Sequence, residues 1–280
     1  MTEPCSLRFN FCKKILTFKS FCAKIKMVMK MMNSYEKLLK LRCFSLADAA
    51  ELYGNENTAK SAIRSLKSKS LLQSVKRDLY VIISMETKAP VSTPFEIASH
   101  ITPSSCISHH TAFEYYGMTN QMFSDIFVSS KERFNSFSFD GRVYRFISSK
   151  IDEGIIEKRD MRVTDKERTL TDSVKDLSKI GGLEELENCI SMITFLDEEK
   201  LLRYLSLYNN GALYKKMGYF MSKAEFKSKL SGHFFEECLK HSDKSVRYLY
   251  EDLRNEDSVY VKEWKLFVPA ASPEEEDIDV

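Results

Sequence analysis

The spacing of apolar residues changes once within residues 34–86, from a helical period to strict alternation. This change limits the folds that the segment can adopt. Apolar side chains recur at helical spacing in three short runs and then alternate with polar ones on either side of a turn at residues 76–78. Three helices followed by a hairpin is the order of a winged helix-turn-helix, whose third helix enters a DNA groove. The sequence therefore predicts such a domain over residues 34–86, with the hairpin as its wing.

Capping signals place the ends of the expected helices. The first is expected over residues 35–42. Ser45 with Asp48 predicts a capping box for the second helix, and Gly54 ends it. The third helix begins at Glu56, and its inward stripe is expected to consist of Ala59, Ala62, Ile63 and Leu66.

The expected third helix carries polar and basic side chains away from its apolar stripe. Three basic residues at i, i+4 and i+7 are placed to contact phosphates, and short polar residues near its start are placed to contact base edges. Two further basic residues lie at the tip of the wing. An ordinary solvated helix face is the alternative interpretation, as is a winged helix that binds protein. The candidate DNA contacts are Asn57, Thr58, Lys60, Ser61, Arg64, Lys67, Lys76 and Arg77.

Charge is distributed unevenly along the chain, although the net charge is only +2. Residues 1–33 hold seven basic residues and one acid, and residues 34–84 hold nine basic residues and five acids. Residues 269–280 contain five acids and no base, and we expect them to form a disordered acidic tail. A basic start and an acidic end are common in nucleic-acid-binding proteins.

Residues 1–33 form a basic N-terminal extension in which lysines interrupt every apolar run. A signal peptide needs an unbroken apolar stretch of about 7–15 residues, which this segment lacks. Four methionines lie close together at the end of this segment, and we expect translation to start near them: Met27, Met29, Met31 and Met32. A basic amphipathic arm that contacts nucleic acid or a membrane surface is the alternative.

Cysteine usage and hydropathy indicate a cytoplasmic protein that is not embedded in a membrane. The seven cysteines are scattered and contain no C-x-x-C pair, which favours reduced thiols over a disulfide framework. No stretch is long and apolar enough to predict a transmembrane helix.

The rest of the chain predicts a larger mixed α/β domain, so the expected fold class is α+β. A linker with two prolines is expected at residues 87–94, followed by a domain over residues 95–268. Its first half should contain helices at 95–100 and 105–116, a strand at 124–130, a hairpin that turns at Asp140-Gly141, and strands within 155–163. Its second half should be helical, starting with a capping box of Thr164 and Glu167, before a final strand at 259–269.

Candidate catalytic and metal-binding residues are sparse. Cys106 and His110 would share a face of the helix expected at 105–116, next to His109, but a four-ligand metal set is missing. Glu263-x-Lys265 matches half of a nuclease signature, and only Asp125 or Asp160 could supply the upstream acid. We therefore expect no enzyme activity, no metal and no cofactor.

Four segments of the chain carry motifs: Arg77, Tyr80 and Val81 in the wing, Ile107, Ser108, Ala112, Phe113 and Gly117 in the next, Asp165, Glu167, Arg168, Thr169, Leu170 and Asp172 in the third, and the closing EWKLFV. In this order, these motifs resemble those of the AbiEi family of antitoxins. The resemblance covers about residues 34–268 and departs from the family at Asp78, where the wing normally has glycine. An acid at the tip of the wing should weaken its phosphate contact, so the third helix is the better candidate for DNA binding.

The resemblance implies an antitoxin of a type IV toxin–antitoxin system from abortive infection, a form of phage defence. The N-terminal domain would bind inverted repeats in its own promoter and repress it, and the C-terminal domain would counter a nucleotidyltransferase toxin, without an assumed stable complex. Asp165, Glu167, Arg168 and Asp172 are the residues of the antitoxin-domain motif, for which a capped helix start is the structural interpretation. Two alternatives remain open: a winged-helix transcriptional regulator with a ligand-sensing or dimerising C-terminal domain, and a DNA-targeted nuclease.

Overall fold

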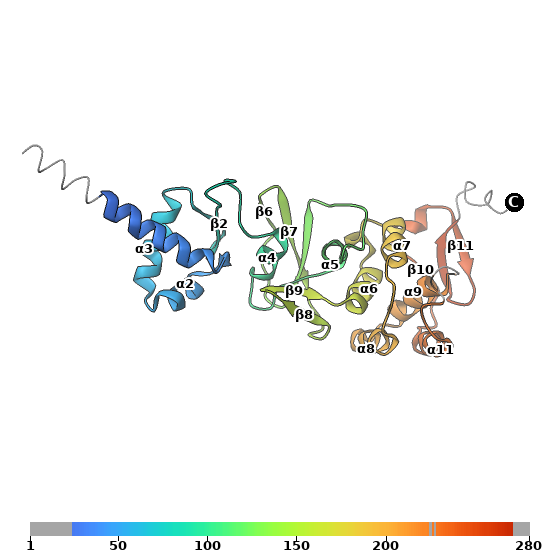
Figure 1. The fold of residues 1–280 in the computed structure, drawn as a ribbon. Coiled ribbons are helices and arrows are strands. Elements are labelled where there is room, and N and C mark those ends of the chain that lie inside the picture. The colour runs from blue at the N-terminus through green and yellow to red at the C-terminus, as the bar shows by residue number, and fades with distance from the viewer. Residues whose placement is uncertain (1–23, 224–225, 227, 271–280) are drawn as a thin grey trace, which may run out of the picture. The chain divides into compact units, whose positions relative to one another are not determined.

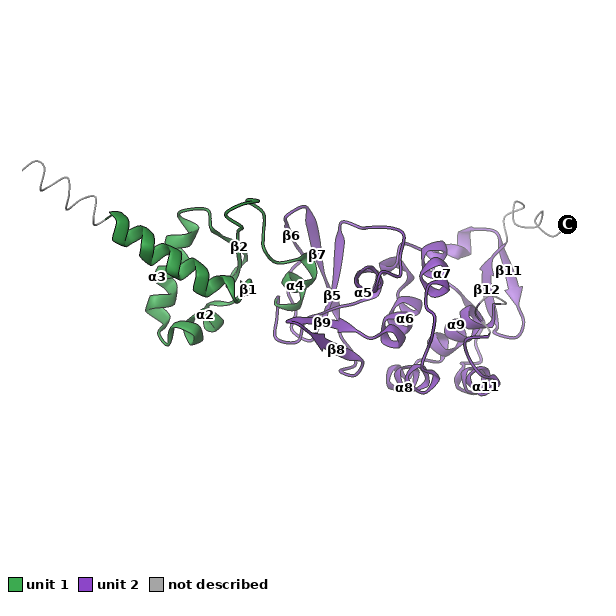
Figure 2. Cartoon of the chain, in the orientation of Figure 1, with its two compact units in different colours: residues 1–100 green, residues 101–280 purple. Residues whose placement is uncertain are grey.

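The chain forms two compact units of α+β structure. The computed structural model describes residues 24–223, 226 and 228–270 (Figure 1). The units are Met1–His100 and Ile101–Val280, called unit 1 and unit 2 here (Figure 2). The α+β class agrees with the sequence-based prediction. Most of the basic extension, at residues 1–23, and the acidic tail from residue 271 lie outside the described residues.

Unit 1 contains a helical layer and a three-stranded antiparallel sheet with the order β1-β3-β2. Its first helix covers residues 24–39, so it starts well before the expected position at Tyr35. Residues 24–34 contain neither proline nor glycine, and nothing in them interrupts a helix. The other elements are β1 (Cys43–Phe44), α2 (Leu46–Tyr53), α3 (Glu56–Lys67), β2 (Leu72–Lys76), β3 (Leu79–Ile82) and α4 (Pro94–Ser99).

The ends of α2 and α3 follow the local signals in the sequence. Ser45 and Asp48 form the predicted capping box, and Gly54 ends α2 with φ 66°. Asn55 caps α3, since its side-chain oxygen accepts a hydrogen bond from the Thr58 N–H at 3.0 Å. The predicted stripe of Ala59, Ala62, Ile63 and Leu66 is buried in the core of unit 1.

The hairpin between β2 and β3 turns at Arg77 and Asp78. Asp78 has φ 60°, the left-handed conformation that glycine adopts most easily. Its carboxylate accepts a hydrogen bond from the Leu46 N–H at 3.0 Å, at the start of α2. The Asp78 carboxylate is therefore held at the positive end of a helix dipole.

Residues 87–94, the expected linker, are ordered against β3. The Val91 N–H donates to the Ile82 carbonyl at 2.9 Å, and Ile83 pairs with Pro90. Arg42 donates to the Val91 carbonyl at 2.7 Å and to Glu96 at 2.9 Å, which ties α4 to unit 1. The boundary between the units consequently lies after His100 and not at the expected position between residues 94 and 95.

Unit 2 is built on a six-stranded mixed sheet with the order β6-β7-β5-β4-β9-β8. The predicted turn at Asp140-Gly141 joins β6 to β7, and both residues have positive φ. Within the sheet, β5 pairs with β7 and β4 pairs with β9 in parallel, and the other neighbours are antiparallel. The strands are β4 (Cys106–Ile107), β5 (Asp125–Ser130), β6 (Phe137–Phe139), β7 (Arg142–Ser148), β8 (Ile155–Lys158) and β9 (Met161–Thr164).

Two expectations for the segments around β4 and α6 (Lys166–Lys175) are wrong. The helix expected at 105–116 is strand β4 followed by a shorter helix, α5 (His109–Tyr116), because Ile107 pairs with Val128 and Val163 in the middle of the sheet. The capping box of Thr164 and Glu167 does not form. Asp165 caps the next helix, and its carboxylate accepts from the Arg168 N–H at 2.7 Å.

The second half of unit 2 is helical, as predicted, and encloses a large apolar core. The strand expected at 259–269 is a hairpin in a small sheet with the order β10-β12-β11, because residues 262–265 form a turn. Helix α11 has no counterpart in the sequence-based prediction. The elements are α6 (Lys166–Lys175), α7 (Leu183–Ser191), α8 (Glu198–Tyr208), α9 (Gly211–Ser222), α11 (Gly232–His241), β10 (Arg247–Tyr248), β11 (Ser258–Val261) and β12 (Leu266–Pro269).

Trp264 packs from this turn directly onto Gly218 of α9. A Cβ atom at Gly218 would lie 2.2 Å from the indole ring, and Trp264 is only 2% exposed. We expect Gly218→Ala to lower the free energy of unfolding by about 1–3 kcal/mol, because the ring must leave its position. Urea denaturation measures this change. Gly232→Ala is the control, since a Cβ there meets no atom within 4 Å, and an equal loss in both variants would contradict the packing argument.

Candidate nucleic-acid interface

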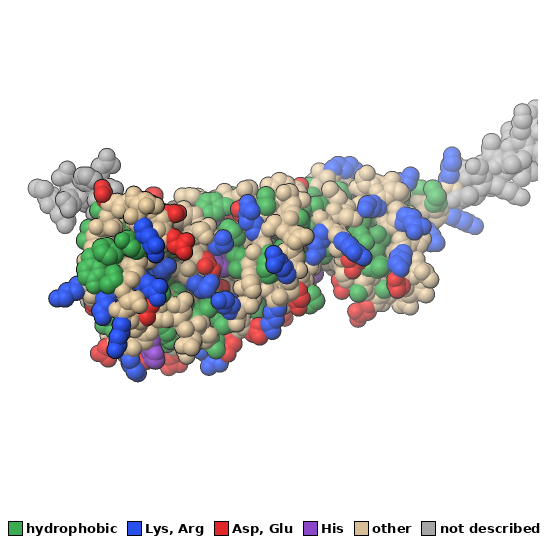
Figure 3. All heavy atoms as spheres, turned by 180° about the vertical axis from the view of Figure 1, so that it is seen from behind, with side chains coloured by type: hydrophobic (Ala, Val, Ile, Leu, Met, Phe, Trp, Pro, Cys, Tyr) green, Lys and Arg blue, Asp and Glu red, His purple; other side chains and the backbone are tan. Residues whose placement is uncertain are grey.

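Unit 1 has an excess of basic over acidic residues, and unit 2 does not. Residues 24–100 contain thirteen basic residues and seven acids, whereas residues 101–270 contain twenty-five basic residues and twenty-seven acids. On the face shown in Figure 3, basic and acidic side chains are intermixed over unit 2, while unit 1 shows many lysine and arginine side chains, with acidic ones grouped along its lower edge. A polyanion would therefore be attracted to unit 1.

The exposed surface of α3 has a centre and two sides. From the 3.6-residue period, Asn57, Ser61 and Arg64 point directly away from the buried stripe, and all three are exposed. Lys60 and Lys67 lie on one side of this line, and Thr58 and Ser65 lie on the other. We call this set the α3 face: residues 57, 58, 60, 61, 64, 65 and 67.

The hairpin borders one side of the α3 face. Lys67 Nζ donates to Ser74 Oγ of β2 at 2.9 Å, and Lys60 forms an ion pair with Glu56 at 2.5 Å, one turn earlier. At the tip of the hairpin Arg77 is exposed and Lys76 is half-buried. Burial lowers the pKa of Lys76, with Asp78 acting in the opposite direction. The structure thus brings six of the eight candidate DNA contacts, Lys60, Arg64 and Lys67 among them, to α3 and places the other two at the tip of the neighbouring hairpin.

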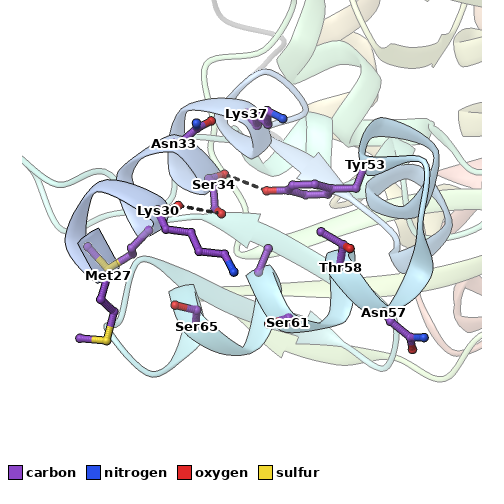
Figure 4. Close-up of a pocket in the computed structure, with 12 residues that line it drawn as sticks. Met27, Lys30, Asn33, Ser34, Lys37, Tyr53, Asn57, Thr58, Ser61 and Ser65 are labelled. Atoms are coloured by element: carbon purple, nitrogen blue, oxygen red, sulfur yellow. Dashed lines mark hydrogen bonds between the residues drawn. The ribbon is translucent and has the colours of Figure 1, made fainter. Parts of the chain in front are cut away.

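The first helix borders the other side of the α3 face. A groove of about 740 Å³ lies between the two helices (Figure 4). The sequence does not predict this groove, because the composition of residues 24–33 indicates the basic extension and not the first helix of the domain. The lining residues are Met27, Lys30, Met31, Asn33, Ser34 and Lys37 from the first helix, Tyr53 from α2, and Asn57, Thr58, Ser61, Ala62 and Ser65 from α3.

The four residues of the antitoxin-domain motif lie inside unit 2 and not on its surface. Asp165, Glu167, Arg168 and Asp172 are between 1% and 4% exposed. The Arg168 Nε donates to both Asp172 carboxylate oxygens, at 2.9 and 3.1 Å, and its Nη1 donates to the carbonyls of Ile151 and Glu153 at 3.0 and 2.7 Å. Arg168 therefore joins α6 to the segment that precedes β8.

The motif's acids also fix α8. Asp165 accepts from the Tyr204 hydroxyl at 2.7 Å, Asp172 accepts from the Tyr208 hydroxyl, and Glu167 accepts from the Asp197 N–H at 3.0 Å, at the start of α8. Burial is the largest of the causes that raise the pKa of both tyrosines. Their hydroxyls therefore stay protonated and act as donors, which makes the motif a buried joint between α6 and α8.

The other candidate sites are not assembled. His110 Nε2 donates a hydrogen bond to the Glu185 carboxylate at 3.3 Å, and its ring stacks on Phe123. Cys106 lies in β4, and burial raises the pKa of its thiol to about 11. Within the described ranges, no three His, Cys, Asp or Glu side chains gather as a metal site. Glu263-x-Lys265 lies in the turn of the small sheet, whereas the candidate partner acids lie elsewhere: Asp125 is in β5 of the six-stranded sheet, and Asp160 is in the turn between β8 and β9.

No helix in the described part of the chain has both the length and the apolar run that a membrane span requires.

Comparison with known proteins gives a likeness of fold alone. No protein-family model matches the chain, and no curated protein matches it. Among solved structures, the chain is similar to the RV2827C protein from Mycobacterium tuberculosis, with a TM-score of 0.58 and 14% sequence identity. The similarity covers 83% of this chain and 89% of that chain, so it extends through both units.

Proposed function

We propose that unit 1 is a winged helix-turn-helix that binds DNA, with α3 as the recognition helix and the β2–β3 hairpin as the wing. The observation that carries this proposal is the α3 face. It is exposed along its whole length, contains three basic residues, and starts with short polar side chains that can contact base edges. The basic tip of the neighbouring hairpin also favours DNA binding over an ordinary solvated helix face.

The function that we propose for the whole chain is that of an AbiEi-like, type IV antitoxin that represses its own operon in the cytoplasm. Binding of unit 1 to inverted repeats in the promoter would supply the repression. Unit 2 would counter a nucleotidyltransferase toxin. The motif order in the sequence supports this assignment, and the burial of the motif indicates that its residues maintain the fold that acts on the toxin. We propose no catalytic step for either unit.

Arg64 is the residue expected to read sequence. We expect Arg64→Ala to weaken operator binding by about 1–3 kcal/mol and to relax discrimination at one base pair, because a bidentate contact to guanine is lost. Binding titrations on operator and scrambled DNA measure both effects. Arg64→Lys is the matched variant, since it keeps the charge and loses the planar fork. Equal losses on operator and scrambled DNA would show that Arg64 contacts phosphate only.

The antitoxin assignment has its own test. We expect a nucleotidyltransferase gene next to the gene for this protein, and we expect co-expression of this protein to restore growth of cells that express that enzyme. A neighbouring enzyme whose toxicity is unchanged at high levels of this protein would refute the assignment. DNA binding by unit 1 would then favour the alternative, a winged-helix regulator whose unit 2 senses a ligand or dimerises.

A further inference from the structure

We infer that the groove between the first helix and α3 holds one phosphodiester strand of the bound DNA. The inference rests on the proposed function, since it assumes that α3 lies in a DNA groove. It assigns a DNA-binding role to residues 24–37, which precede the α3 face and its helix-turn-helix.

A recognition helix needs a protein surface on each of its two sides that can contact the flanking phosphates. A helix in the major groove has a phosphate strand on each side, because the two backbones flank the groove. On the side of Lys60 and Lys67, the β2–β3 hairpin with Arg77 at its tip borders the α3 face. On the opposite side, that of Thr58 and Ser65, the border is the first helix.

The first helix presents a row of positive charge to this side. Lys26, Lys30 and Lys37 are spaced at i, i+4 and i+11, so they lie along one side of the helix over about 16 Å. All three are exposed, and Lys30 and Lys37 line the groove. The Lys30 side chain points from the first helix toward the part of α3 that carries Ser61 and Ser65 (Figure 4).

The lining of the groove suits an anionic, hydrogen-bonding strand. Nine of its twelve residues are polar or basic, and none of the twelve, all of which belong to the described chain, is acidic. The Ser61 and Ser65 hydroxyls on α3 and the Asn57 amide supply short-range donors, and the lysines supply charge. Tyr53 closes the groove at the α2 side, where its hydroxyl donates to the Ser34 carbonyl at 3.5 Å.

A second copy of the chain fits this groove less well than DNA does. A symmetric dimer brings the same patch of both subunits together. The lysine row would then approach its own copy with no acid of the groove to offset it, and like charges oppose such a contact. A polyanion is the occupant that the charges favour.

The test is the salt dependence of DNA binding by the full chain with Lys30→Ala and Lys37→Ala combined. Two lost phosphate contacts lower the slope of log K against log salt by about 1.8. The ratio of wild-type to variant affinity should accordingly shrink about tenfold between about 50 mM and about 200 mM salt, on operator and scrambled DNA alike. The control is Lys40→Ala with Lys88→Ala, which removes the same charge from exposed positions of unit 1 outside the groove.

A second variant tests occupancy of the groove without a change of charge. Asn33→Leu places an apolar side chain on the wall formed by the first helix, away from the α3 face, and we expect it to weaken binding to both DNAs while the protein keeps its thermal stability. Unchanged slope and unchanged affinity in both groove variants would overturn the inference, as would a change in molar mass in analytical ultracentrifugation without a change in slope, which assigns the groove to a second copy. If Lys60→Ala, Arg64→Ala and Lys67→Ala combined, which lie outside the groove lining, abolish binding while the groove variants do not, this inference alone fails. If wild-type protein binds no DNA, the proposed function fails with it.

Discussion

Replacing Arg168 by methionine is expected to destabilise unit 2 by about 3–5 kcal/mol, because it leaves the Asp172 carboxylate buried without its partner. Arg168 is 1% exposed and Asp172 is 2% exposed, so water cannot replace the lost bonds. The carbonyls of Ile151 and Glu153 lose a donor as well. Urea denaturation, followed by circular dichroism, should show a lower midpoint with an unchanged slope.

A surface pair in the same unit provides the control. Arg203 donates to Glu153 at 2.7 Å, but its side chain is 63% exposed, so Arg203→Met should change the free energy of unfolding far less than Arg168→Met does. The double variant Arg168→Met with Asp172→Leu should recover much of the loss, since a buried ion pair replaced by apolar side chains is often tolerated. If Arg168→Met and Arg203→Met cost the same small amount, Arg168 is not the joint described here.

The loss of stability expected for Arg168→Met bears on the role of the motif formed by Asp165, Glu167, Arg168 and Asp172, because a lost activity can result from unfolding alone. If Arg168→Met abolishes protection from the toxin, the loss should follow unfolding and should be restored in the Arg168→Met, Asp172→Leu protein. A folded, stable double variant that still fails to protect cells would show that these side chains contribute to neutralisation in another way.

The sequence predicted those parts of the fold whose causes are local. Ser45 with Asp48, Gly54 and the stripe from Ala59 to Leu66 act within one or two turns of helix, and α2 and α3 agree with the prediction. The turn at Asp140-Gly141 is equally local, because two consecutive residues with positive φ determine it.

The parts that the sequence did not predict have their causes far away in the chain. Cys106–Ile107 is a strand only because β5 and β9 lie on either side of it. Its two residues are too short a segment to be told apart, in sequence, from the helix expected at 105–116. Trp264 lies in a turn because Gly218, more than forty residues earlier, leaves room for its ring. Residues 87–94 look like a linker in composition, but their backbone hydrogen bonds to β3 place them in unit 1.

The candidate site divides in the same way. The α3 face follows from helical period alone, so all of its residues could be named from the sequence. The groove could not, because it needs the first helix to lie beside α3. The sequence offers one signal for this helix, the absence of proline and glycine from residues 24–34. The lysines and methionines of the same segment also suggest a start site, which favours the other interpretation.

Removing the basic residues of α3 together should separate the two proposed activities. We expect Lys60→Ala, Arg64→Ala and Lys67→Ala combined to weaken operator binding about 100-fold or more and to lower the salt slope by about two units, since two phosphate contacts and one base contact are lost. Alanine favours helix, so α3 should remain folded, and far-ultraviolet circular dichroism checks this. Promoter repression in cells should be lost, while protection from the toxin should persist because unit 2 is unchanged.

The control removes the same charge from other exposed positions of unit 1: Lys40→Ala, Lys69→Ala and Lys88→Ala combined. It should keep repression, because a contact at a fixed distance matters more than net charge at physiological salt, where charges beyond about 8 Å are largely screened. Two outcomes would contradict the division of labour. If both triple variants lose repression equally, the effect is one of net charge and α3 is not the reader. If the α3 variant also loses protection from the toxin at matched expression, unit 1 takes part in neutralisation, and the activities are not separated between the two units.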